Sequence, residues 1–369
     1  GTRLIRGNAL AARLYRSVVD LGVTVLRNST VLELLRTEQG VTGVVYARSG
    51  AHVALQATRG VILATGGVSA SMRFREMLMP HAASHVSMLP DGNSGDGVSL
   101  ALAHGAVLGP EKLKNGCLTP VSVMKSANGD VVKYPHLAFD RCKPGSIMVD
   151  AAGHRFTNEA ACYHDVVTAM HARGAVPAWL IGDRPFQRRY GMGLARPFPY
   201  PVRPLVRDGY LVEAASLEEL ARKIEVSPGV LAQTVARFNE LARTGVDADF
   251  GRGGNAYDRS LGDVEHGPNP SLGEIRHGPF YALKLYPGDV GTFRGLRVNT
   301  NAQVTDAEGK VFSGLYACGL DMDSVFAGFY PGAGAMHGPN ITFAYVAARH
   351  LAREDVSRKP STHPVQAAA

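Results

Sequence analysis

Apolar and polar positions at the start of the chain follow first a helical and then a strand-like pattern. Apolar residues recur at helical spacing from 8 to 21, and Gly22 ends that run. Short apolar segments bounded by turn residues then predict four strands, at 23–26, 31–35, 41–47 and 52–57. Residues 60–67 form a further apolar run that breaks on two glycines, which predicts a buried strand followed by a tight turn.

The rest of the chain predicts helices, strands and one long loop. Asp96 opens a predicted helix at 98–104, and its carboxylate lies where the helix dipole favours negative charge. Ser216 starts a capping box, and Ser227 precedes a proline at the start of a second helix. Residues 244–275 are rich in Gly, Asp, Asn and Pro and predict a loop. The last part predicts strands at 281–285, 296–299 and 314–317 and a closing helix at 341–352.

The composition is that of an ordinary globular protein large enough for two domains. The chain has 369 residues, of which 45% are apolar and 19% are charged. The net charge of +7 is scattered, without a basic stripe interleaved with aromatic residues, so nucleic-acid binding is not predicted. The sequence has no run of 18 apolar residues, so no membrane span is predicted. The four cysteines are dispersed and lack metal-ligand spacing, which predicts no metal site and fits a reducing cytoplasm.

Two glycine-rich stretches are candidates for cofactor contacts. Residues 63–67 end a strand on two glycines, so the backbone could approach a diphosphate or a ribose, although a plain strand-end turn needs glycine as well. Residues 330–340 place several glycines before a helix. The free N–H groups of such a helix start favour an anion, and a reduced flavin carries negative charge near N1 and O2. The sequence contains no strand–GxGxxG–helix fingerprint.

Six motifs in a fixed order make the chain similar to the FAD-dependent fumarate reductases and 3-ketosteroid dehydrogenases. They lie at 60–67, 95–97, 154–159, 280–282, 314–319 and 330–342. The resemblance extends from residue 6 to residue 351 and implies an α/β fold that binds FAD. It identifies the chain as a relative of flavin-dependent dehydrogenases that act on CH–CH groups.

Three positions separate the two branches of that superfamily. Fumarate reductases place an arginine acid where this chain aligns Gln187, a substrate-binding histidine near 288–292, and an arginine at the position of Tyr330. Without those cations a dicarboxylate would be held poorly, so fumarate and succinate are not the expected substrates. The chain instead resembles the ketosteroid dehydrogenases, whose Tyr-Pro-Gly-x-Gly motif matches 330–334 and whose Asn-Glu-x-x-x-Tyr-x-Asp motif matches 158–165.

The resemblance implies roles for three catalytic groups. The Tyr330 hydroxyl and the Gly334 N–H would donate to the ketone oxygen and so acidify the neighbouring C–H, as an oxyanion hole does. Tyr163 would take that proton, and flavin N5 would take a hydride from the next carbon. Because the reference pKa of tyrosine is about 10, a tyrosine base needs a positive or hydrogen-bonding neighbour, and His164 is its neighbour in sequence. A structural phenol bonded to a backbone carbonyl is the other interpretation of Tyr163.

The resemblance also implies the cofactor contacts and the domain organisation. The expected FAD contacts are Val31, Ala64, Thr65, Gly66, Gly67, Asp96, Gly319, Gly338, Asn340 and Ile341. A discontinuous Rossmann-like FAD-binding domain is expected at 1–108 and 286–369, with an inserted α+β substrate cap at 109–285. Its N-terminal βαβ unit, with the GxGxxG turn and a further active-site tyrosine, is expected upstream of Gly1. That segment would be needed to complete the FAD site.

Three functions stay open from the sequence. The first is a dehydrogenase that acts on a 3-ketosteroid-like ketone, with a small-molecule substrate and an electron acceptor that the sequence does not identify. The second is a fumarate-reductase-like flavoprotein that acts on another enone or unsaturated acid. The third is a folded but inactive fragment without cofactor.

Overall fold

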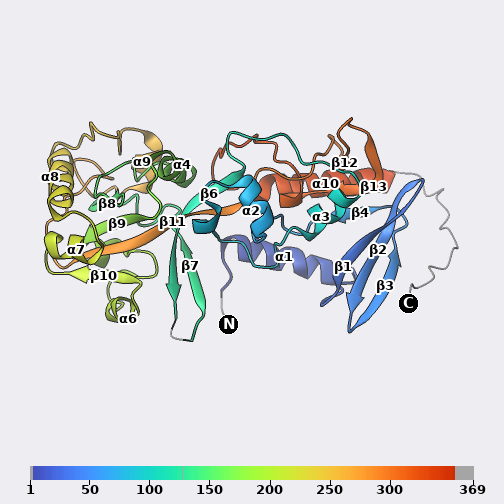
Figure 1. The fold of residues 1–369 in the computed structure, drawn as a ribbon, viewed down its shortest axis with the longest axis horizontal. Helices are drawn as coiled ribbons and strands as arrows, with labels where there is room; N and C mark the ends of the chain where they lie inside the picture. Colours follow the sequence, from blue (N-terminus) through green and yellow to red (C-terminus); the bar gives the residue numbers. More distant parts are fainter. Residues whose placement is uncertain (1–2, 127, 354–369) are drawn as a thin grey trace.

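A long strand, β11 (Phe280–Thr292), runs through the middle of the elongated molecule and joins its two halves (Figure 1). Its first residues pair with β9 (Ala178–Asp183) and β10 (Leu211–Ala214). Its last residues pair with β6 (Gly116–Lys125) and β5 (Val86–Ser87). The structure is a computed structural model that describes residues 3–126 and 128–353.

The half that contains most of residues 109–285 is built on a mixed sheet with the strand order β7-β6-β11-β9-β8. Its other strands and its helices are β7 (Val131–Pro135), β8 (Ser146–Val149), α4 (Tyr163–Arg173), α5 (Arg184–Tyr190), α6 (Arg203–Arg207), α7 (Leu217–Lys223), α8 (Pro228–Thr244) and α9 (Ala256–Leu261). The predicted cap at Ser216 is present, since its side chain accepts a hydrogen bond from Glu219 N. Helix α8 starts at the predicted proline and buries Leu231, Val235 and Phe238 against the sheet.

The other half combines an antiparallel sheet with a small sheet that contains a parallel pair. The antiparallel sheet is β1 (Thr30–Thr37), β2 (Gly40–Arg48) and β3 (Ala51–Gln56), and the second is β4 (Val61–Leu63), β13 (Val311–Ala317) and β12 (Gln303–Thr305). The helical segments are α1 (Arg6–Asp20), α2 (Met72–Leu78), η1 (Ala82–Ser84), α3 (Asp96–Ala103), η2 (Gly319–Asp321) and α10 (His337–Arg353). Gly60 is required where β4 approaches β13, because a Cβ there would lie 2.7 Å from the carbonyl oxygen of Gly314. The predicted α/β fold class is confirmed.

Several local predictions differ from the structure. Residues 23–26 form no strand, since no strand of the described residues lies beside them and their apolar side chains are exposed. Residues 296–299 form only isolated bridges. The predicted loop at 244–275 contains α9, which Asn255 caps by accepting from Asp258 N. The predicted domain boundary at 285/286 falls inside β11; the division into domains stays a prediction, and residues 354–369 lie outside the described residues.

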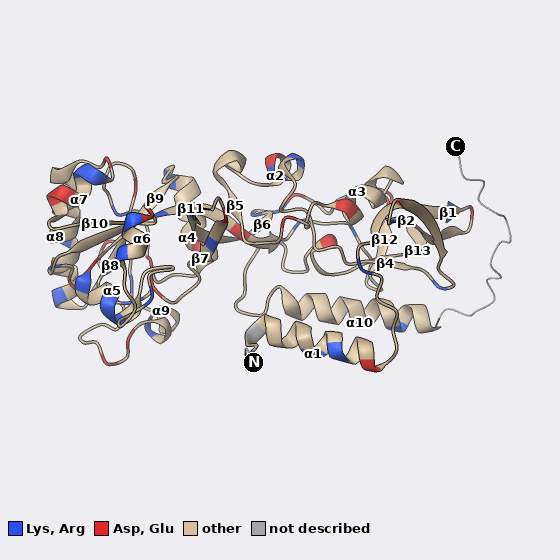
Figure 2. Cartoon of the chain, turned by 90° about the horizontal axis from the view of Figure 1, so that it is seen from below, with Lys and Arg blue, Asp and Glu red and all other residues tan. Residues whose placement is uncertain are grey.

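Helices α1 and α10 lie side by side along one face of the half that contains the antiparallel sheet (Figure 2). A Cβ on Gly7 of α1 would lie 3.3 Å from the His337 ring of α10. The apolar stripe predicted for α1 is not buried, because Leu14 is 51% exposed and Leu21, just after the helix, is 79% exposed. None of the described helices is long and apolar enough to cross a membrane.

A buried network of hydrogen-bonded side chains crosses the sheet of the half that contains most of residues 109–285. Asp140 Oδ2 lies 2.7 Å from His136 Nδ1, and His136 Nε2 lies 2.8 Å from Ser122 Oγ. Ser122 Oγ in turn lies 2.7 Å from the Tyr210 hydroxyl. This is the residue order of a hydrolase triad, but Ser122 and His136 are fully buried, so no substrate can reach the serine. This network of hydrogen bonds therefore holds the strands of the sheet in place.

The pKa of Asp140 predicts how the stability that this network contributes changes at low pH. Burial alone would raise that pKa, but the interaction with His136 and two backbone N–H donors lower it from 3.8 to about 2. The stabilisation from ionised Asp140 is therefore present above the unfolded-state pKa and is lost as the pH falls through about 2. We expect Asp140→Asn to lower the free energy of unfolding at pH 7 and the difference from the natural protein to shrink on acidification. Urea unfolding at a series of pH values measures this, with the exposed Asp130→Asn as control; a constant difference would contradict it.

Candidate active site

Two tyrosines from distant parts of the chain meet at the junction of the two halves. Tyr163 is the first residue of α4, and Tyr330 lies in the loop between η2 and α10. The Tyr163 hydroxyl donates a hydrogen bond to the Tyr330 hydroxyl across a sequence separation of 167 residues. The ring centroids are 4.8 Å apart. The structure thus brings together the two side chains to which the resemblance gives roles in one reaction.

His164 lies behind this pair and not merely next to Tyr163 in sequence. Its ring centroid is 6.5 Å from that of Tyr330, with the two planes at 29°. Its Nδ1 accepts a hydrogen bond of 3.2 Å from Leu118 N on β6. Burial lowers the pKa of His164, so the ring is neutral at pH 7 and Nε2 carries the proton. That this ring lies beside Tyr330 could not be predicted from the sequence.

The surroundings of Tyr163 and Tyr330 favour the protonated form of both phenols. Burial raises the pKa of Tyr163, and the hydrogen bond to Tyr330 raises it further. Burial also raises the pKa of Tyr330, whereas accepting the hydrogen bond from Tyr163 works in the opposite direction. Because Tyr163 donates to the Tyr330 oxygen, the proton of Tyr330 is free for a third group. A carbonyl oxygen is an acceptor of the right kind.

The glycine-rich loop that follows Tyr330 is open. A pocket of about 450 Å³ is lined by the loop and the first turns of α10, including Gly332, Gly334 and Gly338. A Cβ added to any of these three glycines would meet no described atom within 4 Å. The Gly334 N–H has no hydrogen-bond acceptor among the described residues. The loop therefore leaves room for a ring system and offers an unused donor beside the tyrosine pair.

The predicted strand-end turn after β4 is held by Asp321 of η2. The buried Asp321 carboxylate accepts hydrogen bonds from Thr65 N, from Thr65 Oγ1 at 2.9 Å and from Gly67 N at 3.0 Å. Burial raises the pKa of Asp321 despite these donors. The amides of Thr65 and Gly67 are therefore already satisfied inside the protein, and a cofactor would meet Thr65, Gly66 and Gly67 through other atoms. Sequence reasoning missed Asp321, because its partners lie up to 256 residues away.

The other predicted cofactor residues lie on the half that carries β4 and α10. Gly319 opens η2, and a Cβ there would lie 3.6 Å from the side chain of Asn340 in the first turn of α10. The remaining four are partly or fully exposed: Val31, Ala64, Asp96 and Ile341. Their contacts with FAD stay predictions.

A helix start lined with open glycines suits the anionic end of a flavin, and two phenols beside it can hold a carbonyl compound. The glycine loop is thus a candidate flavin-binding site. Comparison with known sequences agrees, since a family described as an FAD binding domain matches residues 1–336. The chain belongs to this FAD-binding family, and the predicted cofactor is confirmed at the level of the family.

Individual relatives are similar over almost the whole chain. The 4-oxocyclohex-2-ene-1-carboxylate 5-dehydrogenase of Sinomonas cyclohexanicum is 41% identical, over 94% of this chain and 60% of its own length. The 3-oxosteroid 1-dehydrogenase of Mycobacterium tuberculosis is 36% identical, over 94% of this chain and 63% of its own length. The crystal structure of 3-ketosteroid delta1-dehydrogenase from Sterolibacterium denitrificans, in complex with 1,4-androstadiene-3,17-dione, superposes with a TM-score of 0.87 at 36% identity, over 95% of this chain and 63% of that chain. The chain thus spans about three-fifths of the length of these relatives.

Removal of the Asp321 carboxylate tests its role in holding the turn. Asp321→Ala leaves two backbone N–H groups and one hydroxyl without their acceptor, so we expect the free energy of unfolding to fall by about 2–4 kcal/mol. Urea or thermal unfolding measures the loss. Asp306→Ala, in an exposed turn where Asp306 accepts from Lys310 N, is the matched control and should cost less than about 1 kcal/mol. Equal losses for the two variants would contradict this role.

Proposed function

We propose that the protein is an FAD-dependent dehydrogenase that removes hydrogen from a CH–CH bond next to the carbonyl of a cyclic ketone. The observation that carries the proposal is the contact of the Tyr163 and Tyr330 hydroxyls beside the open Gly334 loop. The family supplies the cofactor, and its relatives named above are dehydrogenases of ring ketones.

The chain's own residues provide binding and proton transfer. The Tyr330 hydroxyl and the Gly334 N–H donate to the ketone oxygen and stabilise the negative charge that develops there. Tyr163, once its own proton has passed to solvent, takes the proton from the carbon next to the carbonyl. Bound FAD would supply the acceptor for the hydride of the following carbon, so that a C=C bond would form as one proton and one hydride leave. Because burial raises the pKa of Tyr163, loss of its own proton is the step that the site must assist.

The substrate is proposed to be a cyclic ketone, either a 3-ketosteroid or a monocyclic oxo-acid. The steroid follows from the motif at 330–334 and from the steroid-bound structural relative. The monocyclic acid is the second candidate, because the cyclohexene carboxylate dehydrogenase is 41% identical to this chain over the aligned residues. An acyclic unsaturated acid is less well supported. Gln187, aligned with the arginine acid of fumarate reductases, is buried and donates its amide to Arg196 O.

The four cysteines are free thiols in the structure. Free thiols fit a reducing compartment, and we propose the cytoplasm as the location.

Substitution of the two tyrosines tests the reaction. In the FAD-loaded protein we expect Tyr330→Phe to slow flavin reduction by a ring ketone about 100-fold, because one carbonyl donor is lost. We expect Tyr163→Phe to do the same and also to remove the rise in rate toward alkaline pH, since the raised pKa keeps Tyr163 protonated at neutral pH. Bleaching of the flavin absorbance near 450 nm by 4-oxocyclohexanecarboxylate, a 3-ketosteroid and succinate measures the rates. Recovery of that absorbance when the reduced protein is mixed with fumarate tests fumarate as an acceptor. Tyr345→Phe, 63% exposed on α10, is the control; loss of activity in this variant, or none in the other two, would overturn the assignment.

We also propose that a polypeptide segment outside this chain completes the FAD site. The exposed apolar residues of α1 and the open glycine loop of α10 support this, as does the greater length of the relatives. We expect residues 1–369 alone to purify with little FAD, and a polypeptide that includes the additional segment to purify with an absorbance band near 450 nm. A stoichiometric flavin band on the isolated chain would refute the need for the segment. Absence of the band from both proteins would favour the cofactor-free fragment.

A further inference from the structure

A single buried arginine holds the backbone that leads into Tyr163. Arg141 is fully buried, and its guanidinium Nη1 donates to the carbonyls of Glu159 and Ala161, at 2.6 Å for Ala161. Ala161 lies two residues before Tyr163, and Cys162, the N-cap residue of α4, makes no side-chain capping bond. The start of α4 therefore depends on a cation for part of its anchoring.

The acceptors of this guanidinium are all backbone oxygens. Besides the two carbonyls before α4, Nε donates to His136 O at 2.7 Å, and Nη2 donates to Leu137 O. Among the described residues no carboxylate forms an ion pair with Arg141. A buried charge without a counter-ion is costly, so its four carbonyl acceptors must be kept in place for it to be tolerated.

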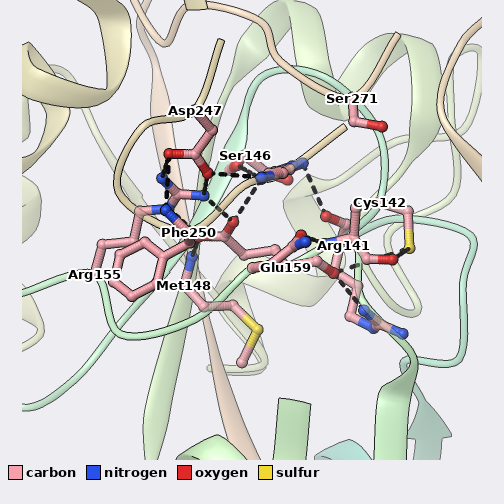
Figure 3. A network of polar contacts seen from close by, with 12 residues as sticks. Arg141, Cys142, Ser146, Met148, Arg155, Glu159, Asp247, Phe250 and Ser271 are labelled. Carbon is pink, nitrogen blue, oxygen red and sulfur yellow. Dashed lines mark hydrogen bonds and ion pairs between the residues drawn. The ribbon is translucent and has the colours of Figure 1, made fainter. Parts of the chain in front are cut away.

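Two polar networks keep Arg141 and its acceptors in place. On one side lies the buried hydrogen-bond network of Asp140, His136, Ser122 and Tyr210, which fixes the backbone that carries the His136 carbonyl. In addition, Asp140 Oδ1 accepts a hydrogen bond of 2.8 Å from Arg141 N. On the other side, a cluster of side chains grips Glu159 (Figure 3).

That cluster fixes the residue whose carbonyl Arg141 contacts. The Glu159 carboxylate accepts from Met148 N at 3.0 Å, from Arg155 at 2.8 Å and from Arg252 at 2.9 Å. Arg155 also binds Asp247, and Arg252 Nη2 donates to Arg141 O at 3.0 Å. Glu159 is thus held by its side chain from one direction and by its carbonyl from the other.

We propose that Arg141 is a positioning residue for Tyr163, an inference that rests on the proposed dehydrogenase function. By holding the carbonyls of Glu159 and Ala161, Arg141 fixes where α4 begins and so directs the Tyr163 hydroxyl toward Tyr330 and toward the carbon from which the proton leaves. Arg141 itself does not touch substrate or cofactor. A displacement of the base by about 1 Å is enough to cost up to roughly 100-fold in rate.

The test uses Arg141→Lys, which keeps the buried charge but cannot span two carbonyls with one planar group. Its matched control is Arg75→Lys, a partly buried arginine that likewise donates to two backbone carbonyls, those of Ser69 and His85, and to no residue of this cluster. Each FAD-loaded protein is reduced with 4-oxocyclohexanecarboxylate carrying hydrogen or deuterium at the carbons next to the carbonyl. Hydrogen exchange of the amides at 161–166 is measured on the same proteins without substrate.

Arg141→Lys should lower the rate of flavin reduction 10- to 100-fold with little change in KM, as roughly expected for a misplaced base. It should also raise the deuterium effect and speed exchange at 161–166. Arg75→Lys should leave the deuterium effect and the exchange at 161–166 unchanged. A folded Arg141→Lys protein with an unchanged deuterium effect and unchanged exchange would overturn the proposal. If the natural holoenzyme is not reduced by any ring ketone, the proposed function fails. Exchange at 161–166 then still shows whether Arg141 anchors α4.

Discussion

The contact between the Tyr163 and Tyr330 hydroxyls is the constraint on which the rest of the site depends. Neither tyrosine is placed by its own local sequence alone. Tyr163 is the first residue of α4. Tyr330 lies in a loop whose earlier residues are held by contacts with other parts of the chain. Lys112 forms an ion pair of 2.7 Å with Asp323 at the beginning of that loop, and Gly328 packs closely on the backbone of Lys114. The position of each hydroxyl is thus set by contacts several residues away from the phenol.

Electrostatics reinforce this geometry. Removing the two phenols from water favours their neutral forms, so the pair persists as a directed hydrogen bond with one proton left for a ligand. The neutral ring of His164 behind Tyr330 adds no charge that would reverse the direction of that bond. Burial that keeps a tyrosine protonated makes its base form scarce at neutral pH, and it also ensures that a hydroxyl proton is present to donate to a carbonyl. Tyr163 and Tyr330 differ in role because Tyr163 donates its hydrogen bond to Tyr330, whereas the proton of Tyr330 remains available to a ligand.

Much of the fold and part of the site could be predicted from the sequence, where the signal is local or periodic. The apolar face of α8, the cap at Ser216 and the antiparallel strands of residues 30–56 follow from spacing of three to four or of two residues. The meeting of Tyr163 and Tyr330 followed from motif order. The roles of Asp321 and Arg141 could not be predicted, because most of their partners are backbone groups, which leave no trace in side-chain identity. The strand expected at 23–26 failed because an apolar run forms a strand only beside a pairing neighbour.

The continuity of β11 limits how the two halves move. A strand that pairs with one sheet segment at its start and another at its end cannot bend sharply without breaking ladder hydrogen bonds, although it can twist about its own axis. Wide separation of the halves is therefore an unfavourable route for a ligand to reach the phenols. Displacement of residues 331–336, which follow Tyr330, include the open glycines Gly332 and Gly334 and form no regular helix or strand, breaks fewer backbone hydrogen bonds and is the easier route.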